Sequence, residues 1–394
     1  MFGDLPPEIL GEILHRLPVK SLVKCTIVCK YLNSFITDQT FIFDHLNQTI
    51  QASSGNGWLF LQLYHQRPIR YEEFYSLYSH NQQIGYFSVK KFPLSSLLQS
   101  FDHSTVVGTC DGLVCITNSQ IHDMATLLIW NPSIRKYILI SEPILTSGTG
   151  NAQHEGYQPL YGFGFDSKNK DFKVIRLVTL YCSKRKRLET LLRKENVPQV
   201  EVFSLASRSW RSIPFRASPF LLPDLFWNIP QVFLNGVVHW VVSRRCDNHI
   251  VNIILTFDVA EETFGELTLP QQLRESTTEL SILQGGDSLC VLHAFYVEDD
   301  CFFSIWVMKE YGVVGSWNEV YCWDSHLYQG ITNVLALCAD GKVVLLLYSG
   351  DVVLLNPVTE VVKSLTGQKW FYAFVGSYVE SLVFIKREPN VLSY

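Results

Sequence analysis

Short hydrophobic strands that each follow a turn dipeptide recur along most of this chain, and this repetition restricts the possible folds more than any other feature. Radial repetition of four-stranded units leaves only short, protected sheet edges. We therefore expect an all-β domain built as a propeller, because the last three dipeptides lie about fifty residues apart, a propeller-type period. The dipeptides are Asp111-Gly112, Asn235-Gly236, Gly286-Asp287 and Asp340-Gly341.

A second mark follows in each unit: an apolar run, often ending in Asx and Pro, that leads into a turn and a hairpin. Asx and Pro supply the turn geometry, and the aromatic residue after the turn packs between neighbouring sheets. The marks favour six blades without fixing the number. They are Ile129-Trp130-Asn131-Pro132, Phe203-Ser204-Leu205, Phe257-Asp258-Val259, Ile305-Trp306-Val307 and Leu354-Leu355-Asn356-Pro357. We also expect residues 371–385 to complete a blade with strands near residues 58–63, which would close the ring.

The first fifty residues have a helical pattern instead. Over residues 8–17 the apolar positions recur on one face of a helix, and Pro18 ends it. Two further helical patterns begin near Ser21 and Lys30, and a closing turn is expected over residues 41–46. We expect a small all-α module of three helices.

Three short helices bury too little surface to be stable alone. Their remaining apolar surface is therefore available either to another protein or to the rest of the chain, and periodicity alone leaves both possibilities open. The expected domain boundaries are a helical module at 1–48, a polar linker at 49–57, a β-domain at 58–385 and a tail at 386–394.

Composition limits the classes of partner. Hydrophobic residues make up 47% of the 394 residues, so the chain can bury a large core. Lys and Arg number 32 against 37 Asp and Glu, and the net charge of -5 gives no footprint for nucleic acid or for a membrane surface. The start carries no signal-peptide pattern, so we expect a cytoplasmic or nuclear protein, or one present in both compartments. The ten cysteines are scattered without zinc-ligand spacing.

The sequence offers little catalytic chemistry. It has no nucleophile elbow, no zinc-protease helix motif and no phosphate-binding loop, so we expect no catalytic residue, no cofactor and no metal site. His239 lies in an alternating strand, where a hydrogen-bonded structural histidine is the expected reading. Gly162 and Gly164 are expected to relieve crowding at a bend. The basic run at 184–187 reads as a solvated insertion, with a nuclear-import signal as the alternative.

The N-terminal pattern resembles the F-box motif in residue type, order and spacing. The matching residues are Leu5-Pro6-x-Glu8-Ile9, Ile13-Leu14-x-Arg16-Leu17-Pro18-Val19-Lys20-Ser21-Leu22, Val28-Cys29-Lys30 and Phe41. Leu32 departs from the family, which usually has Trp there. The resemblance implies docking on a Skp-family adaptor and, through it, on a cullin. The implied contact residues are Leu5, Pro6, Ile9, Ile13, Leu17, Pro18, Val19 and Leu22.

Most of residues 105–365 resembles the kelch-like F-box-associated domain of the large plant F-box family. The strict kelch repeat is not met, because only Gly285-Gly286 has the double glycine. The pieces that carry the resemblance are Asp111-Gly112-Leu113-Val114, Trp130-Asn131-Pro132, Tyr161-Gly162-Phe163-Gly164-Phe165-Asp166, Val202-Phe203-Ser204-Leu205, Asn235-Gly236-Val237-Val238-His239-Trp240 and Ile254-Leu255-Thr256-Phe257-Asp258.

Together the two resemblances imply the substrate-recognition subunit of a Skp-cullin-F-box ubiquitin ligase. In this reading the helical module binds the adaptor and the propeller binds a protein target for ubiquitination. The contribution of such a subunit is proximity and orientation rather than bond chemistry. The alternatives are an interaction scaffold that uses its F-box outside ubiquitin transfer and, with less support from the motifs, a propeller enzyme.

Overall fold

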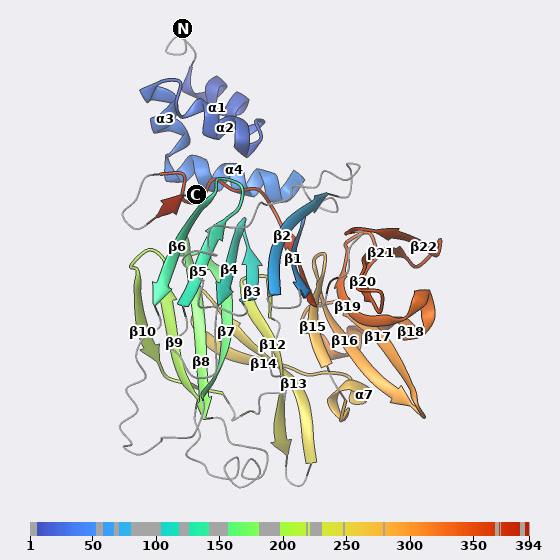
Figure 1. Cartoon of the computed structure of the whole chain (residues 1–394). Helices are drawn as coiled ribbons and strands as arrows, with labels where there is room; N and C mark the ends of the chain where they lie inside the picture. Colours follow the sequence, from blue (N-terminus) through green and yellow to red (C-terminus); the bar gives the residue numbers. More distant parts are fainter. Residues whose placement is uncertain are drawn as a thin grey trace.

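The protein is mainly β, with a helical module over one face of a β-propeller (Figure 1). The computed structural model describes residues 6–52, 58–66, 71–79, 104–117, 126–141, 157–180, 198–217, 220, 231–246, 249–278, 280–366, 370, 372–386 and 391–393. Leu5, the basic run at 184–187 and residues 53–57 of the expected linker lie outside these ranges.

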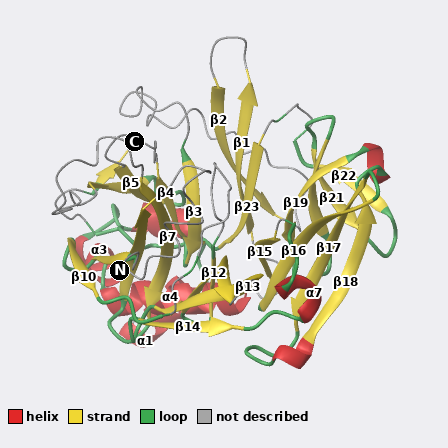
Figure 2. Ribbon diagram, turned by 90° about the horizontal axis from the view of Figure 1, so that it is seen from below, coloured by secondary structure: helices red, strands yellow, loops and turns green. Residues whose placement is uncertain are grey.

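Over the described residues the strands form six blades set radially, as Figure 2 shows. Blades 5 and 6 are joined into one sheet by a single parallel bridge between Gly285 and Leu337.

Blade 1 comprises β1 (Trp58–Gln66), β2 (Tyr71–Ser79) and β23 (Tyr372–Tyr378), and blade 2 comprises β3 (Thr105–Cys110), β4 (Leu113–Thr117), β5 (Thr126–Asn131) and β6 (Lys136–Ser141). Blade 3 comprises β7 (Tyr157–Asp166), β8 (Asp171–Leu180), β9 (Gln199–Ser204) and β10 (Ser209–Ile213), and blade 4 comprises β11 (Val232–Leu234), β12 (Val237–Cys246), β13 (His249–Asp258) and β14 (Thr263–Leu267). Blade 5 comprises β15 (Leu280–Gly285), β16 (Ser288–Val297), β17 (Asp300–Met308) and β18 (Trp317–Asp324), and blade 6 comprises β19 (Ile331–Leu337), β20 (Val343–Leu347), β21 (Val352–Asn356) and β22 (Val361–Ser364).

Blade 1 joins the two ends of the β-domain. β23, near the C-terminus, pairs antiparallel with β1, placing Val375 opposite Leu61. Neighbouring blades then contact one another around the ring, from β3 to β7, β12, β15, β19 and β23 and back to β3. The expected pairing of the C-terminal run with strands near residues 58–63 is confirmed for residues 372–378, and it leaves the ring without an open edge at blade 1. Residues 379–385 of the expected run are not part of the strand.

The turn dipeptides lie where the repeat predicts. Asp111 and Gly112 have φ values of 47° and 80° between β3 and β4, and Asn235 and Gly236 have 54° and 79° between β11 and β12. Positive φ at both central residues is the geometry of the tight hairpin turn that suits the strand twist, and Asn-Gly or Asp-Gly adopts it most readily.

The glycines of β7 relieve crowding, as expected, but the crowding comes from the neighbouring blade rather than from a bend. A Cβ atom at Gly162 would lie 2.5 Å from Cζ2 of Trp240, and one at Gly164 would lie 2.6 Å from Cδ2 of Phe233. The indole Nε1 of Trp240 donates a hydrogen bond to the Tyr161 carbonyl at 2.7 Å. These glycines therefore let blades 3 and 4 pack at short range.

The helical module has four helices within the described residues rather than the three expected. They are α1 (Pro7–His15), α2 (Val19–Cys25), α3 (Lys30–Ile36) and α4 (Gln39–Ala52). The expected closing turn is the start of α4, which buries Phe41, Ile42, His45 and Leu46. The expected linker at 49–57 is also too long at its N-terminal side, because α4 continues through Ala52.

The expected C-terminal tail is partly ordered in the β-domain. β24 (Leu392–Ser393) pairs antiparallel with β6, placing Leu392 opposite Tyr137.

The short helices α7 (Gln271–Arg274), η2 (Val314–Ser316) and η3 (Leu327–Gln329) connect strands of blades 4 to 6. None of the described helices is long and apolar enough to cross a membrane.

Candidate partner-binding surfaces

Helix α1 has two apolar sides with different surroundings. Leu10 and Leu14 are buried in the protein core, whereas Ile9 and Ile13 are 46% and 48% exposed. The predicted apolar face is therefore wider than the core contact requires. Ile9 and Ile13, one turn apart, keep enough apolar surface for a partner, and both belong to the predicted adaptor-contact set.

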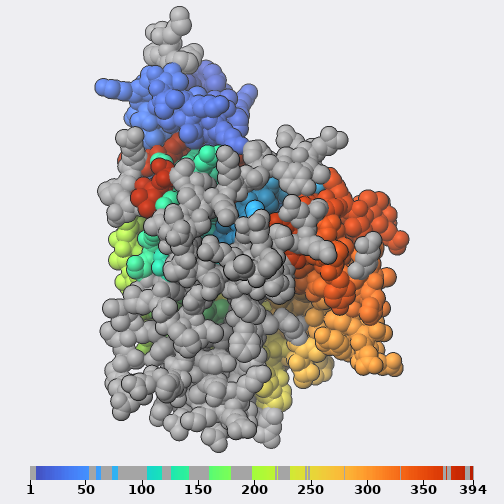
Figure 3. Space-filling view, viewed as in Figure 1, coloured from blue at the N-terminus to red at the C-terminus, as the bar shows by residue number. Residues whose placement is uncertain are grey.

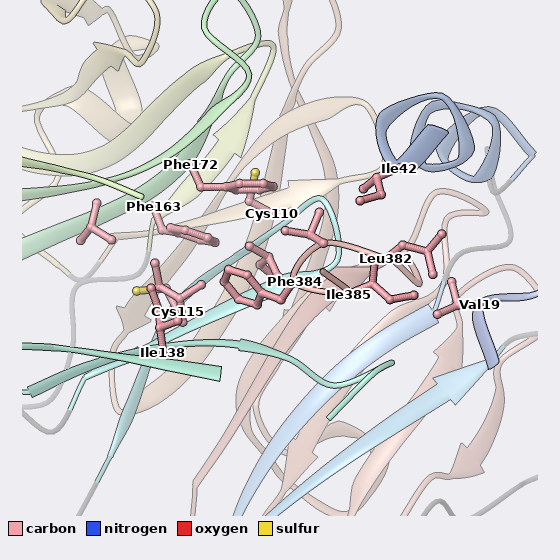
Figure 4. Packing of buried hydrophobic residues seen from close by; sticks show 14 of the residues in the cluster. Val19, Ile42, Cys110, Cys115, Ile138, Phe163, Phe172, Leu382, Phe384 and Ile385 are labelled. Carbon is pink, nitrogen blue, oxygen red and sulfur yellow. The ribbon is translucent and has the colours of Figure 1, made fainter. Parts of the chain in front are cut away.

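Val19 and Leu22 do not fit their predicted role as adaptor contacts. Their side chains are only 1% and 0% exposed, because they pack in the same buried cluster as Leu382 and Ile385 of the C-terminal region. Figure 4 shows Val19 beside these two C-terminal side chains. A side chain without accessible surface cannot contact another protein in this conformation, so both residues belong to the internal core.

The other predicted contacts lie at the ends of α1 and α2. Pro6 and Pro18 are exposed and immediately precede the two helices. Leu17 is half-buried, and its carbonyl accepts a hydrogen bond from Nε2 of His45 at 3.0 Å. Pro6, Leu17 and Pro18 are therefore accessible to different degrees, and they bracket the exposed side of α1.

Sequence reasoning missed three exposed apolar residues at the junction of α2 and α3, of which Tyr31 lies in the first turn of α3. Ile27, Val28 and Tyr31 are 85%, 60% and 43% exposed. Val28 was part of the matched motif, but no contact role was assigned to it. The available signal was that Tyr31 directly precedes the core residue Leu32 in α3, so a helix places the two side chains about 100° apart and not on one face.

A ring stack joins α1 to α4. The imidazole of His15 stacks on Phe41 with ring centroids 4.5 Å apart, and His45 lies 6.3 Å from His15. Burial lowers the pKa of both histidines, and for His45 it outweighs the opposing hydrogen bond to Leu17. Both rings are therefore neutral near pH 7, which suits their apolar surroundings.

A segment that we call the C-terminal strap, residues 381–385, packs in one buried cluster with the helices and blade 2. Figure 3 shows red atoms of the C-terminal region directly beneath the blue helical module. The side-chain amide of Asn131 donates hydrogen bonds to the carbonyls of Ser381 and Val383, at 3.0 and 2.8 Å. The ammonium group of Lys136 donates to the carbonyls of Phe384 and Ile385, both at 2.8 Å. The strap thus satisfies its backbone through blade 2 and presents apolar side chains to the helices.

Helix α4 makes a second contact, with blade 3. The ring of Phe43 lies 5.4 Å from that of Phe165, and Nζ of Lys170 lies 5.4 Å from the centre of the Phe43 ring. A cation over an aromatic ring is favourable, and the rings add apolar contact. The helical module is therefore held on the propeller at two blades, on the side where β3 turns into β4 and β7 into β8.

Two buried polar side chains of the propeller core, His239 and Lys173, have structural partners. His239 is fully buried, with Nδ1 3.1 Å from the Val232 carbonyl and Nε2 2.7 Å from the Tyr311 hydroxyl, which confirms its structural reading. Burial lowers the pKa of His239 to about 4.

Between blades 3 and 4, the Lys173 ammonium donates to Asp166 at 2.6 Å and to Glu262 at 2.8 Å. Within the described residues, no group of three or more His, Cys, Asp or Glu side chains is arranged to hold a metal ion.

Comparisons with known proteins agree with this architecture. A family model described as "F-box associated beta propeller domain" matches residues 70–385, and an "F-box-like" model matches residues 2–49. The chain belongs to the F-box-associated β-propeller family. The first model covers most of the chain and ends at the last residue of the strap. The F-box-like match spans α1 to α3 and most of α4.

Curated relatives from Arabidopsis thaliana are named as F-box proteins, and one of them is named as an F-box/kelch-repeat protein. The chain is 28% identical to "F-box protein CPR1" over 328 residues, covering 81% of this chain and 73% of that protein. It is 28% identical to "F-box/kelch-repeat protein At3g23880" over 363 residues, covering 90% and 88%. Among solved structures, the tricorn protease matches with a TM-score of 0.34 and 8% identity over 81% of this chain and 35% of that chain, a likeness that supports no argument.

Proposed function

We propose that this F-box protein is the substrate receptor of a Skp-cullin-F-box ubiquitin ligase. The observation that carries the proposal is the division of α1, where Leu10 and Leu14 hold the helix in the core while Ile9 and Ile13 remain nearly half exposed. Fully burying one aliphatic side chain contributes about 1.5–3 kcal/mol, and about half of that remains available at each of these two residues, so together they supply part of a docking interaction. Membership in the F-box family supports the Skp-family adaptor as the partner.

The propeller supports the second half of the proposal. The helical module covers the side that carries the β3–β4 and β7–β8 turns. Antiparallel strands place the β12–β13, β16–β17 and β20–β21 connections on the opposite side. Loops on a rigid scaffold are the usual place for binding residues. A target bound there is held by the same body that docks on the adaptor, and the gain for ubiquitin transfer is proximity and orientation.

The adaptor contact is tested by an Ile9→Asp, Ile13→Asp double variant of the full chain. Binding to a purified Skp-family adaptor should fall by at least about a hundredfold, because two desolvated anchors are replaced by charges. The thermal unfolding midpoint should stay close to that of the parent, because both side chains are solvent-exposed. Ile250→Asp is the matched control, since Ile250 is 53% exposed on the propeller.

Adaptor binding that survives the double change would contradict the docking face. A separate measurement distinguishes the receptor from a scaffold that uses its F-box without ubiquitin transfer. In a reconstituted ligase containing the adaptor, the cullin and the full chain, a protein bound to the propeller should become ubiquitylated. A bound protein that stays unmodified while the complex assembles would favour the scaffold.

A further inference from the structure

Three exposed apolar side chains lie on blades 5 and 6, on the side of the propeller opposite the helical module. Tyr296 at the end of β16 is 67% exposed, Leu327 in the connection from β18 to β19 is 46% exposed, and Tyr348 just after β20 is 66% exposed. Exposed tyrosines offer a large apolar area at low cost in side-chain entropy, which is why they are frequent in binding surfaces.

Backbone contacts join these connections into one continuous strip. The amide of Ser325 donates to the Cys301 carbonyl at 2.8 Å, so the β18–β19 connection lies against the β16–β17 hairpin. The amide of Tyr348 donates to the Gly330 carbonyl at 2.8 Å, so the same connection lies against the β20–β21 hairpin. A side chain at Gly330 would overlap the Tyr348 ring, which shows how closely the two segments pack.

The strip is strongly acidic at one end. Glu298, Asp299 and Asp300 are consecutive and exposed at the tip of the β16–β17 hairpin. Within the described residues their one ion pair is between Asp300 and His326, at 3.4 Å, and it exists only when the imidazole is protonated. We call the three apolar and three acidic residues the blade 5–6 rim. The rim therefore combines apolar contact area with uncompensated negative charge.

We propose that the blade 5–6 rim binds a segment of the target protein in which Lys or Arg side chains flank an apolar side chain. The apolar side chain packs against the tyrosines and Leu327, and the cations face the carboxylates at the hairpin tip. The proposal rests on the proposed function in calling the bound protein a target. Charge complementarity selects the occupant, because exposed acids attract a cationic segment and steer its approach.

The same charge argues against other occupants. A second copy of this rim would bring like charges together, and the phosphates of nucleic acids or anionic lipids would also be repelled.

The connection from β18 to β19 is held in a fixed conformation by its packing. Tyr328 has a left-handed backbone with φ 55°, a conformation that residues with a side chain rarely adopt. Its side chain packs against the core between blades 5 and 6, and the adjacent Leu327 faces solvent.

The test uses the full chain and three fluorescein-labelled synthetic peptides of equal length. The first alternates Lys and Arg with Leu, the second replaces the cations by Glu, and the third replaces Leu by Ser. Fluorescence polarisation should show saturable binding of the first peptide, weakened at least about tenfold for either of the others. Raising the ionic strength should weaken binding of the first peptide, because exposed charges are screened.

Two variants of the rim separate its parts. Tyr296→Ser with Tyr348→Ser should weaken binding of the first peptide by about tenfold or more. Glu298→Gln, Asp299→Asn and Asp300→Asn together should weaken it and remove most of its salt dependence. The control is Val358→Ser with Val361→Ser, because these valines are exposed on blade 6 at the β21–β22 turn, on the opposite side.

Three results would overturn the proposal: no saturable binding of the cationic apolar peptide, equal binding of the acidic peptide, or an equal loss of binding in the valine control. Adaptor pull-down with the rim variants gives the separate readout for the proposed function. If adaptor binding fails in the parent while the peptide binds the rim, the ligase assignment is wrong and the rim stands. If adaptor binding is normal and the peptide does not bind, the rim proposal alone is wrong.

Discussion

The side-chain amide of Asn131 donates a hydrogen bond to the backbone carbonyl of Ser381, 250 positions later in the chain, at 3.0 Å. Asn131 is fully buried, and its side-chain oxygen accepts the amide of Ser133 to form the turn after β5. Asp258 and Asn356 form the equivalent turns in blades 4 and 6 through a side-chain oxygen, and among the described residues the amide group of Asn356 holds no segment as Asn131 holds residues 381 and 383. The side-chain oxygen of Asn131 therefore forms the turn that recurs in other blades, and its NH2 group has the additional role of binding the strap.

This division of roles predicts that Asn131→Asp lowers the free energy of unfolding by about 2–4 kcal/mol, because two hydrogen bonds are lost and a buried carboxylate faces two carbonyls. Asn356→Asp should change it by no more than about 0.5 kcal/mol, since the turn needs only an acceptor there. Urea unfolding of both variants measures the difference. Equal effects would show that the amide does not hold the strap.

Gly112 offers an independent measurement of the same contact. Ala at Gly112 or at Gly236 meets a left-handed backbone, with φ values of 80° and 79°, at a cost of about 1–2 kcal/mol. A Cβ at Gly112 would also overlap Cβ of Ser381 and lie 2.8 Å from the Val379 carbonyl oxygen, whereas nothing lies within 4 Å of one at Gly236. We expect Gly112→Ala to be more destabilising than Gly236→Ala by about 1–3 kcal/mol in thermal unfolding. Equal losses would mean that the strap shifts freely.

Truncating a buried and an exposed residue of the helical module should separate stability from docking. Leu22→Ala leaves a cavity in the core and should lower the free energy of unfolding by about 2–5 kcal/mol. Ile13→Ala should cost less than about 1 kcal/mol in stability but weaken adaptor binding, because Ile13 is exposed. Calorimetry and adaptor titration below both melting temperatures test the pair. A direct loss of adaptor affinity in folded Leu22→Ala would return Leu22 to the contact set.

The buried histidines predict acid sensitivity. The folded-state pKa of His239 is about 4, below its usual value of 6.5, so the unfolded chain binds the proton more tightly. Stability should therefore be greatest above about pH 6.5 and should fall as the pH drops toward 4, with a slope from this residue approaching about 1.4 kcal/mol per pH unit. His15, His45 and His293 act in the same direction, because burial also lowers the pKa of each.

Unfolding of a His239→Gln variant at several pH values isolates that contribution. Its stability should vary less steeply with pH than that of the parent between about pH 4 and 6.5. Parallel curves for His239→Gln and the parent would show that His239 does not take up the proton on unfolding.

The β-domain was largely predictable because its signals are local. The Asp111-Gly112 and Asn235-Gly236 turns need positive φ at both residues, and few other residue pairs adopt it. Helix α4 was missed although Phe41, Ile42, His45 and Leu46 have helical spacing, because the three apolar members alone resemble a short turn. A longer window that includes His45 as a core residue would have found it.

The burial of Val19 and Leu22 was not predictable in the same way. Their spacing matches an exposed docking motif as well as a core, and the choice depends on which other segment covers them. The covering residues include Leu382 and Ile385, which are far away in sequence and read locally as the continuation of a strand. Tertiary contact, rather than residue type, decided between the two roles that periodicity left open for the helices.

The strap also makes the order of synthesis matter. Residues 6–52 leave the ribosome long before residues 381–385, so Val19 and Leu22 of a growing chain lack the side chains that later cover them. The covered module is complete only after β23 has been made and the ring can close. A nascent chain interrupted within the propeller therefore displays uncovered apolar surface, which is what chaperones and quality-control proteases bind, instead of a finished helical module.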